Sequence, residues 1–298
     1  MWGILKILAF VIPLMIGFSE TIMIPFKDDT TVYLYYDIDK VILPFYQEPG
    51  FYFDKISLSP DGKLIAAIAI SKKFFSDKNG YPYQKHKLVL LNLKSEIIMV
   101  IPDVQVFSWS PDSSKLAYIA GIDYEGFAFT PSGLWILDVK SKDIRKLDPI
   151  GGYDIYWASF DNHIYATDFR LVYKYDPKTG EKTETTYKGI YFSPDGKFYF
   201  KKGYEGKSSL HLTTTNEDIT LTFDFSRKIA ESYDIKWAPN GEMFLLLGGD
   251  LACRVWQVKT KKLIMEIPKV ENAWWQQDSS GIFVQKFHRP QIIKHSIP

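Results

Sequence analysis

SLSPDGKLIAA, residues 57–67, is the most informative stretch of the sequence, because variants of it recur along the chain. It recurs as SWSPDSSKLAY (108–118), YFSPDGKFYF (191–200) and KWAPNGEMFLLL (236–247). In each copy an aromatic or apolar residue precedes a turn built around proline, and an apolar strand follows the turn. Such a recurring unit indicates a protein assembled from structural repeats.

The residues of the turn are those that a β-hairpin requires. Pro60 fixes φ at about −65°, Asp61 suits the next position, and Gly62 takes the left-handed conformation that ends the loop. The copy at 112–114 has no glycine, so that turn must differ or carry strain. A phosphate loop needs more glycines and a following helix, and calcium needs several oxygen ligands at short spacing. We therefore interpret the motif as a structural hairpin.

The residue before each turn serves as an anchor that measures the repeat. Successive anchors lie 51, 48, 35, 45 and 38 residues apart. The anchors are Leu58, Trp109, Trp157, Phe192, Trp237 and Trp275. Four short strands with their turns take about 40–50 residues, the length of one propeller blade. Alternation of apolar and polar residues with period two, as in LVYKYD (171–176), indicates strands rather than helices.

The sequence thus predicts an all-β protein, a six-bladed β-propeller of four-stranded antiparallel blades spanning residues 30–290. The sixth repeat contains only two strands, whereas TTVYLYYDIDKVILPF (30–45) has the strand–turn–strand pattern that it lacks. We expect N-terminal strands to pair with C-terminal strands in one mixed blade, because this closure removes exposed sheet edges. Residues 291–298 remain as a C-terminal tail.

The SPDGK turn followed by an apolar strand, repeated about six times, resembles the TolB-like six-bladed propeller (PD-G/WD40-like β-propeller repeat) superfamily. The resemblance covers most of the chain. TolB has an extra N-terminal α/β domain for which this sequence leaves no room, so its binding of Pal is not implied. RVWQVKTKKLI (254–264) is also similar to a WD-repeat strand, without the glycine–histidine and Trp-Asp marks. The hydrolase domain that accompanies prolyl oligopeptidase propellers is missing.

The first residues have the pattern of a signal peptide, predicted over 1–19. Lys6 precedes the uncharged segment 7–18, and Gly17 and Ser19 suit the −3 and −1 positions of a cleavage site. The apolar segment has about 12 residues, whereas a membrane span needs about 20. An uncleaved anchor or a buried strand are the alternatives. We expect export to the periplasm or the extracellular space, with membrane contact only through an uncleaved segment.

Charge and composition exclude several classes of function. The 36 Lys and Arg residues balance 35 Asp and Glu residues, so no basic surplus indicates nucleic-acid binding. The single cysteine, Cys253, excludes an internal disulfide and lies in an apolar segment, which favours a buried thiol. The sequence contains neither a His/Cys cluster nor a G-x-S-x-G motif. We therefore predict no catalytic residue, metal or cofactor.

Two long insertions provide the first candidate site. They occupy residues 71–87 and 121–133, in adjacent blades, which would bring them together on one face. Both are rich in aromatic residues: Phe74, Phe75, Tyr81, Tyr83, Tyr124, Phe127 and Phe129. Exposed aromatic side chains are typical of a partner-binding surface. Alternatively, the insertions fold back and cover blade edges.

Polar residues near the start of the innermost strands provide the second candidate site. They are Asp54, Asp154, Asp234 and Asn272. Such positions lie at the mouth of the central channel, where they could surround a ligand or cation. The interpretation that we favour is structural: these side chains cap strands or bond the backbone of a neighbouring blade.

These observations favour an exported, monomeric, non-enzymatic propeller. It would bind a protein or envelope component, or another ligand, through the loops of its top face. The alternative is a channel-centred enzyme, a hydrolase or lyase acting on a small or sugar-like substrate through Asp54, Asp154 or Asp234. A third hypothesis is a structural scaffold within a larger membrane complex. Fold alone does not distinguish these hypotheses.

Overall fold

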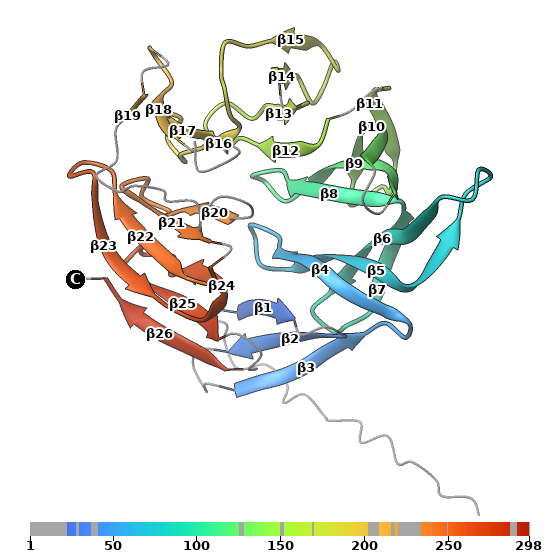
Figure 1. Ribbon diagram of the computed structural model, residues 1–298, viewed down its shortest axis with the longest axis horizontal. Helices are drawn as coiled ribbons and strands as arrows, with labels where there is room; N and C mark the ends of the chain where they lie inside the picture. Colours follow the sequence, from blue (N-terminus) through green and yellow to red (C-terminus); the bar gives the residue numbers. More distant parts are fainter. Residues whose placement is uncertain are drawn as a thin grey trace, which may run out of the picture.

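A computed structural model gives the fold of the chain (Figure 1). It describes residues 23–27, 30–36, 41–124, 128–149, 152–168, 170–201, 209–215, 218–219, 234–248, 250–286 and 291–297. The expected signal peptide, residues 1–19, lies outside these ranges, and so does Phe127. All regular structure in the described ranges is β-strand. The sheets stand side by side around a ring, and the first strand of each faces the centre (Figure 1).

The predicted all-β propeller is confirmed: six blades begin at the predicted anchors, and the N-terminal strands add a further sheet to the ring. Each blade begins with a strand that ends at a predicted anchor residue. These inner strands are β4 (Phe51–Leu58), β8 (Val104–Trp109), β12 (Asp154–Trp157), β16 (Tyr191–Phe192), β20 (Asp234–Trp237) and β24 (Val270–Trp275). The anchors therefore mark the true repeat, although their spacing varies.

The remaining strands of each blade run antiparallel to their neighbours, from the centre outward. The first two blades add β5 (Leu64–Ser76), β6 (Pro82–Asn92), β7 (Ile97–Pro102), β9 (Lys115–Tyr124), β10 (Ala128–Asp138) and β11 (Ile144–Asp148). The next two add β13 (Ile164–Thr167), β14 (Val172–Tyr175), β15 (Lys182–Glu184), β17 (Phe198–Lys201), β18 (Ser209–Leu212) and β19 (Asp218–Ile219). The last two add β21 (Met243–Leu247), β22 (Cys253–Gln257), β23 (Lys262–Ile267), β25 (Gly281–Lys286) and β26 (Ile292–Ser296).

The ring closes differently from the expected mixed blade. The N-terminal strands β1 (Met23–Lys27), β2 (Thr31–Tyr36) and β3 (Val41–Gln47) form their own three-stranded sheet. β26 lies in the predicted tail and completes a three-stranded sheet with β24 and β25. The strands at each end thus pair with one another, and among the described residues no ladder joins N-terminal to C-terminal strands. The N-terminal sheet stands between β24–β26 and β4–β7 (Figure 1).

Packing between sheets explains the continuous apolar run of β5. Ile65 and Ala67 pack toward the N-terminal sheet, whereas Ala66 and Ile68 pack toward the second blade. All four are fully buried. A strand that is covered on both faces loses the alternation of polar and apolar residues seen at a solvent-exposed sheet. The same reason accounts for the five buried residues of MFLLL (243–247).

The hairpin turns confirm the structural interpretation of the repeated motif. Gly62 has φ 73°, and its N–H donates to the Ser59 carbonyl over 2.9 Å. The Ser59 hydroxyl donates to the Asp61 carboxylate over 2.7 Å. Burial disfavours the charged form of Asp61, but hydrogen bonds from Ser59 and Lys63 outweigh it and hold the pKa of this carboxyl below its usual value. In the described part of the chain, no group of three or more His, Cys, Asp and Glu side chains is placed to hold a metal ion.

Within the described ranges, the structure has no helix with the length and apolar character that a membrane span requires.

Candidate functional site

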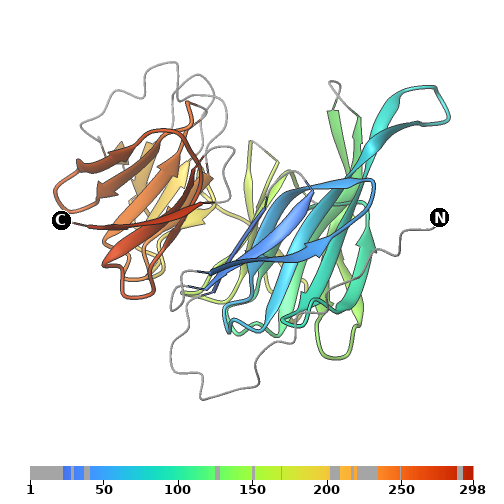
Figure 2. The same ribbon diagram turned by 90° about the horizontal axis from the view of Figure 1, so that it is seen from below.

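The two insertions meet through backbone pairing between adjacent blades. The β5–β6 and β9–β10 hairpins extend beyond their blades, and Tyr83 and Gln84 of β6 pair with Tyr124 and Asp123 of β9. This pairing joins two blades into one eight-stranded sheet. We call residues 72–85 together with 121–124 and 128–131 the arm. Figure 2 shows the β5–β6 hairpin rising beyond the ring beside the β9–β10 hairpin.

A tight turn orders the tip of the arm. The Asp77 carboxylate accepts the backbone N–H groups of Asn79 and Tyr81, each over 2.8 Å. The backbone N–H of Asp77 also donates to the Tyr81 carbonyl over 3.0 Å. Gly80 has φ 85°, a conformation that glycine adopts without strain. The tip therefore presents Tyr81 on an ordered backbone.

Strand register divides the aromatic residues of the arm between two rows. Phe75 pairs with Tyr83, which pairs with Tyr124. The rings of Phe75 and Tyr83 have centroids 5.9 Å apart, and the Lys85 ammonium lies 4.2 Å from the Phe75 centroid. The Phe75 ring is therefore partly covered by Tyr83 and Lys85. For Tyr124 the structure describes the backbone alone.

The other row carries Phe74. It runs from Phe74 through Gln84 and Asp123 to Phe129, whose backbone alone is described. Phe74 is 51% exposed, and Tyr81 at the tip is 50% exposed. Exposure of this extent shows that these two side chains do not fold back to cover blade edges. Among the described side chains of the arm, these are the two exposed aromatic ones.

Hydrogen bonds fix the arm to the first blade. The Gln84 amide donates to the Ser71 carbonyl over 2.7 Å, and the Lys72 N–H donates to the Gly50 carbonyl over 2.9 Å. The Tyr52 hydroxyl donates to the Gln84 side-chain oxygen over 3.4 Å. The arm is thus continuous with the rigid sheet. We did not predict these positioning residues, because a single glutamine in a sequence gives no signal of its partners.

The lysines of the first insertion are further candidate binding residues, which we did not predict because the prediction considered only aromatic residues. Residues 71–87 contain five lysines and one aspartate, although the whole chain has a net charge of only +1. Lys87 is paired with Glu48 over 2.8 Å. The other four are exposed: Lys72, Lys73, Lys78 and Lys85. This local charge imbalance was readable in the sequence and makes the β5–β6 half of the arm positive, whereas the second insertion, residues 121–133, contains Asp123 and Glu125 and no lysine or arginine.

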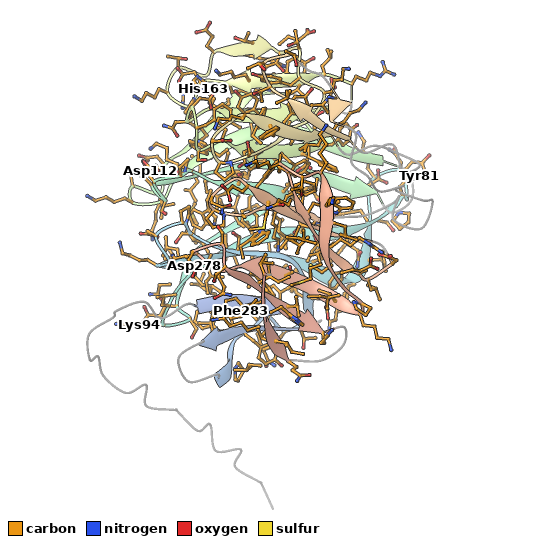
Figure 3. The ribbon with its side chains drawn as sticks, turned by 90° about the vertical axis from the view of Figure 1, so that its left-hand side faces the viewer. Tyr81, Lys94, Asp112, His163, Asp278 and Phe283 are labelled. Atoms are coloured by element: carbon orange, nitrogen blue, oxygen red, sulfur yellow. The ribbon has the colours of Figure 1, made fainter. Side chains whose placement is uncertain are left out.

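The arm and the repeated turns lie on opposite faces of the ring. In Figure 3, Tyr81 lies on one side, whereas Asp112, His163 and Asp278 of the turns between first and second strands lie on the other. Propeller connections alternate between the two faces, because each strand reverses the direction of the previous one. The motif that reveals the fold is therefore remote from the candidate binding surface.

Three of the residues predicted at the channel mouth take part in contacts between side chains. The Asp154 carboxylate accepts a hydrogen bond from the Tyr191 hydroxyl of the next blade. The Lys236 ammonium lies 3.3 Å from the Asp234 carboxylate and donates to the Asn272 side chain over 2.8 Å. These contacts link β12 to β16 and β20 to β24. Their geometry supports the structural interpretation over a ligand ring.

Asp54, the fourth residue, is exposed and lies in an irregular part of β4. The register of β4 shifts between Phe53 and Ile56, so Asp54 and Lys55 interrupt the ladder. The Lys55 ammonium donates to the Phe107 carbonyl of the second blade over 3.0 Å. This irregularity directs one charged side chain to the neighbouring blade and leaves the other in solvent.

Indole groups add further bonds between inner strands. Trp237 Nε1 donates to the Tyr191 carbonyl over 3.0 Å, and Trp275 Nε1 donates to the Lys236 carbonyl over 2.8 Å. The predicted anchors Trp237 and Trp275 therefore each donate a hydrogen bond to the preceding blade. These two bonds join inner strands and so hold neighbouring blades together.

Comparison with known proteins supports a propeller with WD40-like repeats. No family model matches the chain. Actin-interacting protein 1 of Drosophila melanogaster is 27% identical over 186 residues, which cover 58% of this chain and 29% of that protein. The chain thus spans less than a third of the length of this relative.

Among solved structures, the chain is similar to one in the crystal structure of a mitotic checkpoint complex. The TM-score is 0.60 at 12% sequence identity, with 89% of this chain and 84% of that chain covered. At this level of identity the similarity shows the fold alone. Together, the blades, the register and these similarities support a β-propeller fold.

Proposed function

We propose that this chain is a non-enzymatic protein-interaction module, which binds a protein partner through the arm. The observation that carries the proposal is the pairing of β6 with β9, because it fixes two hairpins of different blades as one sheet. That sheet holds Phe74 and Tyr81 in solvent. Large aromatic side chains on an ordered backbone lose little conformational freedom when they bind, which favours their use as binding hot spots.

The similar proteins support a protein partner as the class of ligand. One is named for an interaction with actin, and the other belongs to a multi-protein complex. These statements describe those proteins, and this chain matches only part of the first. They support protein binding in general and leave the partner of this chain to experiment. The inter-blade contacts of Asp154 and Asn272 favour this proposal over a channel-centred enzyme.

The proposal is tested by quantitative capture of partners with the full chain as bait. The binding variant combines Phe74→Ala with Tyr81→Ala. The control variant combines Ile97→Ala with Ile144→Ala, because these side chains are 52% and 41% exposed on outer strands. We expect at least one protein to be captured by wild type and control and lost by the binding variant.

Purified components then give the size of the effect. Removal of hot-spot aromatic side chains weakens binding by about tenfold or more, which isothermal titration calorimetry measures directly. Circular dichroism melts of the three proteins check that all remain folded. If the binding variant captures the same proteins at the same affinity as wild type, the arm is not the binding surface and the proposal fails.

A further inference from the structure

One edge of β5 is uncovered along the arm. β4 pairs with β5 only as far as Phe51 and Ser71. β5 then continues to Ser76, and this last part pairs with β6 on its other side. In the part of the chain that the structure describes, no strand pairs with the outer edge of residues 74–76. An uncovered edge presents backbone donors and acceptors that can pair with an added strand.

Contacts at the base define where this edge begins. The Lys72 N–H is bonded to the Gly50 carbonyl, and the Ser71 hydroxyl lies 3.1 Å from both the N–H and the carbonyl oxygen of Lys73. The backbone of residues 72 and 73 is therefore occupied within the chain. The edge proper consists of Phe74, Phe75 and Ser76.

Charge around the edge selects the kind of strand that it accepts. Lys72, Lys73, Lys78 and Lys85 are exposed, and none of them is paired with a carboxylate among the described residues. The nearest acid in sequence, Asp77, is bonded to backbone N–H groups of its own turn. Asp123 lies in the same row as Phe74 but in β9, which β6 separates from the free edge of β5. Lysines on an edge oppose pairing with an apolar strand or with a second copy of the same arm. They favour an acidic strand.

We propose that the edge of β5 at residues 74–76 binds an extended acidic segment of a protein partner as an additional strand. The inference rests on the proposed function and specifies its chemistry. Backbone hydrogen bonds position the segment, Phe74 packs on its apolar side chains, and Lys72 and Lys73 pair with its carboxylates. Backbone pairing distinguishes this occupant from an anionic lipid surface, which attracts lysines without adding a strand.

The test uses fluorescence anisotropy with the full chain and an array of ten-residue peptides. The probes alternate Glu with Val or Thr, which favours an extended conformation. One control set replaces Glu with Lys, and another replaces the central residues with proline, which removes backbone donors. We expect binding by the acidic strand peptides alone, and protection of residues 74–76 in hydrogen–deuterium exchange.

Charge variants locate the site. Lys72→Glu with Lys73→Glu should weaken peptide binding by about tenfold or more, because attraction becomes repulsion. Lys72→Gln with Lys73→Gln should weaken it less. Lys94→Glu with Lys140→Glu is the matched control, since both lysines are exposed in turns between outer strands, away from the arm. This control should bind like wild type.

Several outcomes would overturn the inference. These are no binding by any acidic peptide, equal binding of the proline peptides, and equal binding of phosphatidylserine vesicles. Concentration-dependent dimerisation that Lys72→Glu with Lys73→Glu abolishes would show that a second copy occupies the edge instead. If partner capture depends on Phe74 and Tyr81 while peptide binding fails, the protein-interaction proposal stands and the acidic-strand inference alone is wrong.

Discussion

The last residue of each repeated turn has a positive φ. Where this residue is serine, its side chain also bonds to a neighbouring blade. Gly62 adopts φ 73° without a steric cost, whereas Ser113 and Ser279 both adopt φ 62°. In these two cases the hydroxyl accepts a backbone N–H from the turn of the preceding blade. The donors are Asp61, over 2.8 Å, and Asn240, over 3.2 Å. A bond between blades thus offsets the strain that the sequence predicts at Ser113.

This interpretation predicts different effects for two substitutions of Ser113. Ser113→Ala removes the acceptor of the Asp61 N–H and keeps the left-handed backbone, so we expect the free energy of unfolding to fall by about 1–2 kcal/mol. Ser113→Gly also removes the acceptor but relieves backbone strain, which is worth about 1 kcal/mol. The loss should therefore be smaller for glycine. Urea unfolding of the two variants and wild type measures the order.

The opposite order, with Ser113→Gly less stable than Ser113→Ala, would show that strain at this residue is negligible.

The sequence predicts the turn because proline, aspartate and glycine act on their own backbone. It does not predict the bond from Asp61 to Ser113, because that bond depends on how closely two blades approach. At Gly196, the same approach excludes a side chain, since an added Cβ would lie 2.6 Å from the Phe160 ring.

At the scale of strands, neighbouring blades are joined by side chains of their inner strands. The hydroxyl of Tyr156 in β12 donates a hydrogen bond to the Phe192 carbonyl of β16 over 3.2 Å. Tyr156 is half-buried, whereas Tyr118 of β9 is buried, at 3% exposure, and its hydroxyl has no hydrogen bond within the described ranges. Burial raises the pKa of both phenols to about 12. The two tyrosines therefore differ in exposure and in the bond between blades, which only the more exposed Tyr156 makes.

Replacing each of these tyrosines by phenylalanine isolates that bond. Tyr156→Phe leaves the Phe192 carbonyl without its donor, and we expect a loss of about 1 kcal/mol in the free energy of unfolding. Tyr118→Phe removes a hydroxyl that makes no bond and should change stability by less than about 0.5 kcal/mol. Guanidinium chloride unfolding compares the two. Equal losses would mean that hydroxyl burial, and not the bond between blades, determines the effect.

Most strands were predictable because their signal is local. The apolar segments after each turn appear where the sequence places them, including β5 and β21. The meeting of the two insertions was also predictable, since adjacent blades bring their connections to one face. The pairing of Tyr83 with Tyr124 was not, because register depends on the length and twist of both hairpins. β26 was assigned to a tail, since a short edge strand has almost no pattern.

For the whole molecule, the closure of the ring was the part that the sequence could not settle. The pattern of residues 30–45 correctly indicates strands, but which strands they pair with is a long-range property. The N-terminal sheet is held by side chains on both sides instead of by a shared ladder. Val32 and Leu34 pack with Phe53 of the first blade, and Tyr33 packs with Phe283 of the last.

This arrangement predicts that the propeller depends on its N-terminal sheet for cooperative folding. A variant that starts at Glu48 removes Val32 and Leu34, which are 0% and 1% exposed, and uncovers Phe53 and Phe283. Each buried apolar side chain contributes about 1.5–3 kcal/mol, and typical domains are stable by about 5–15 kcal/mol in total. The free energy lost when both faces of the N-terminal sheet are removed is therefore comparable to the total free energy of unfolding. We expect no cooperative thermal transition.

The matched control starts at Met23, which leaves every described strand in place. Differential scanning calorimetry should show one sharp transition for this control, within a few degrees of the full chain. Size-exclusion chromatography should show that the shorter variant aggregates, because the faces of the first and last blades become exposed and have no other sheet to pack against. A cooperative transition of the Glu48 variant near that of the control would mean that the six blades close without the N-terminal sheet, through contacts between β4–β7 and β24–β26 alone.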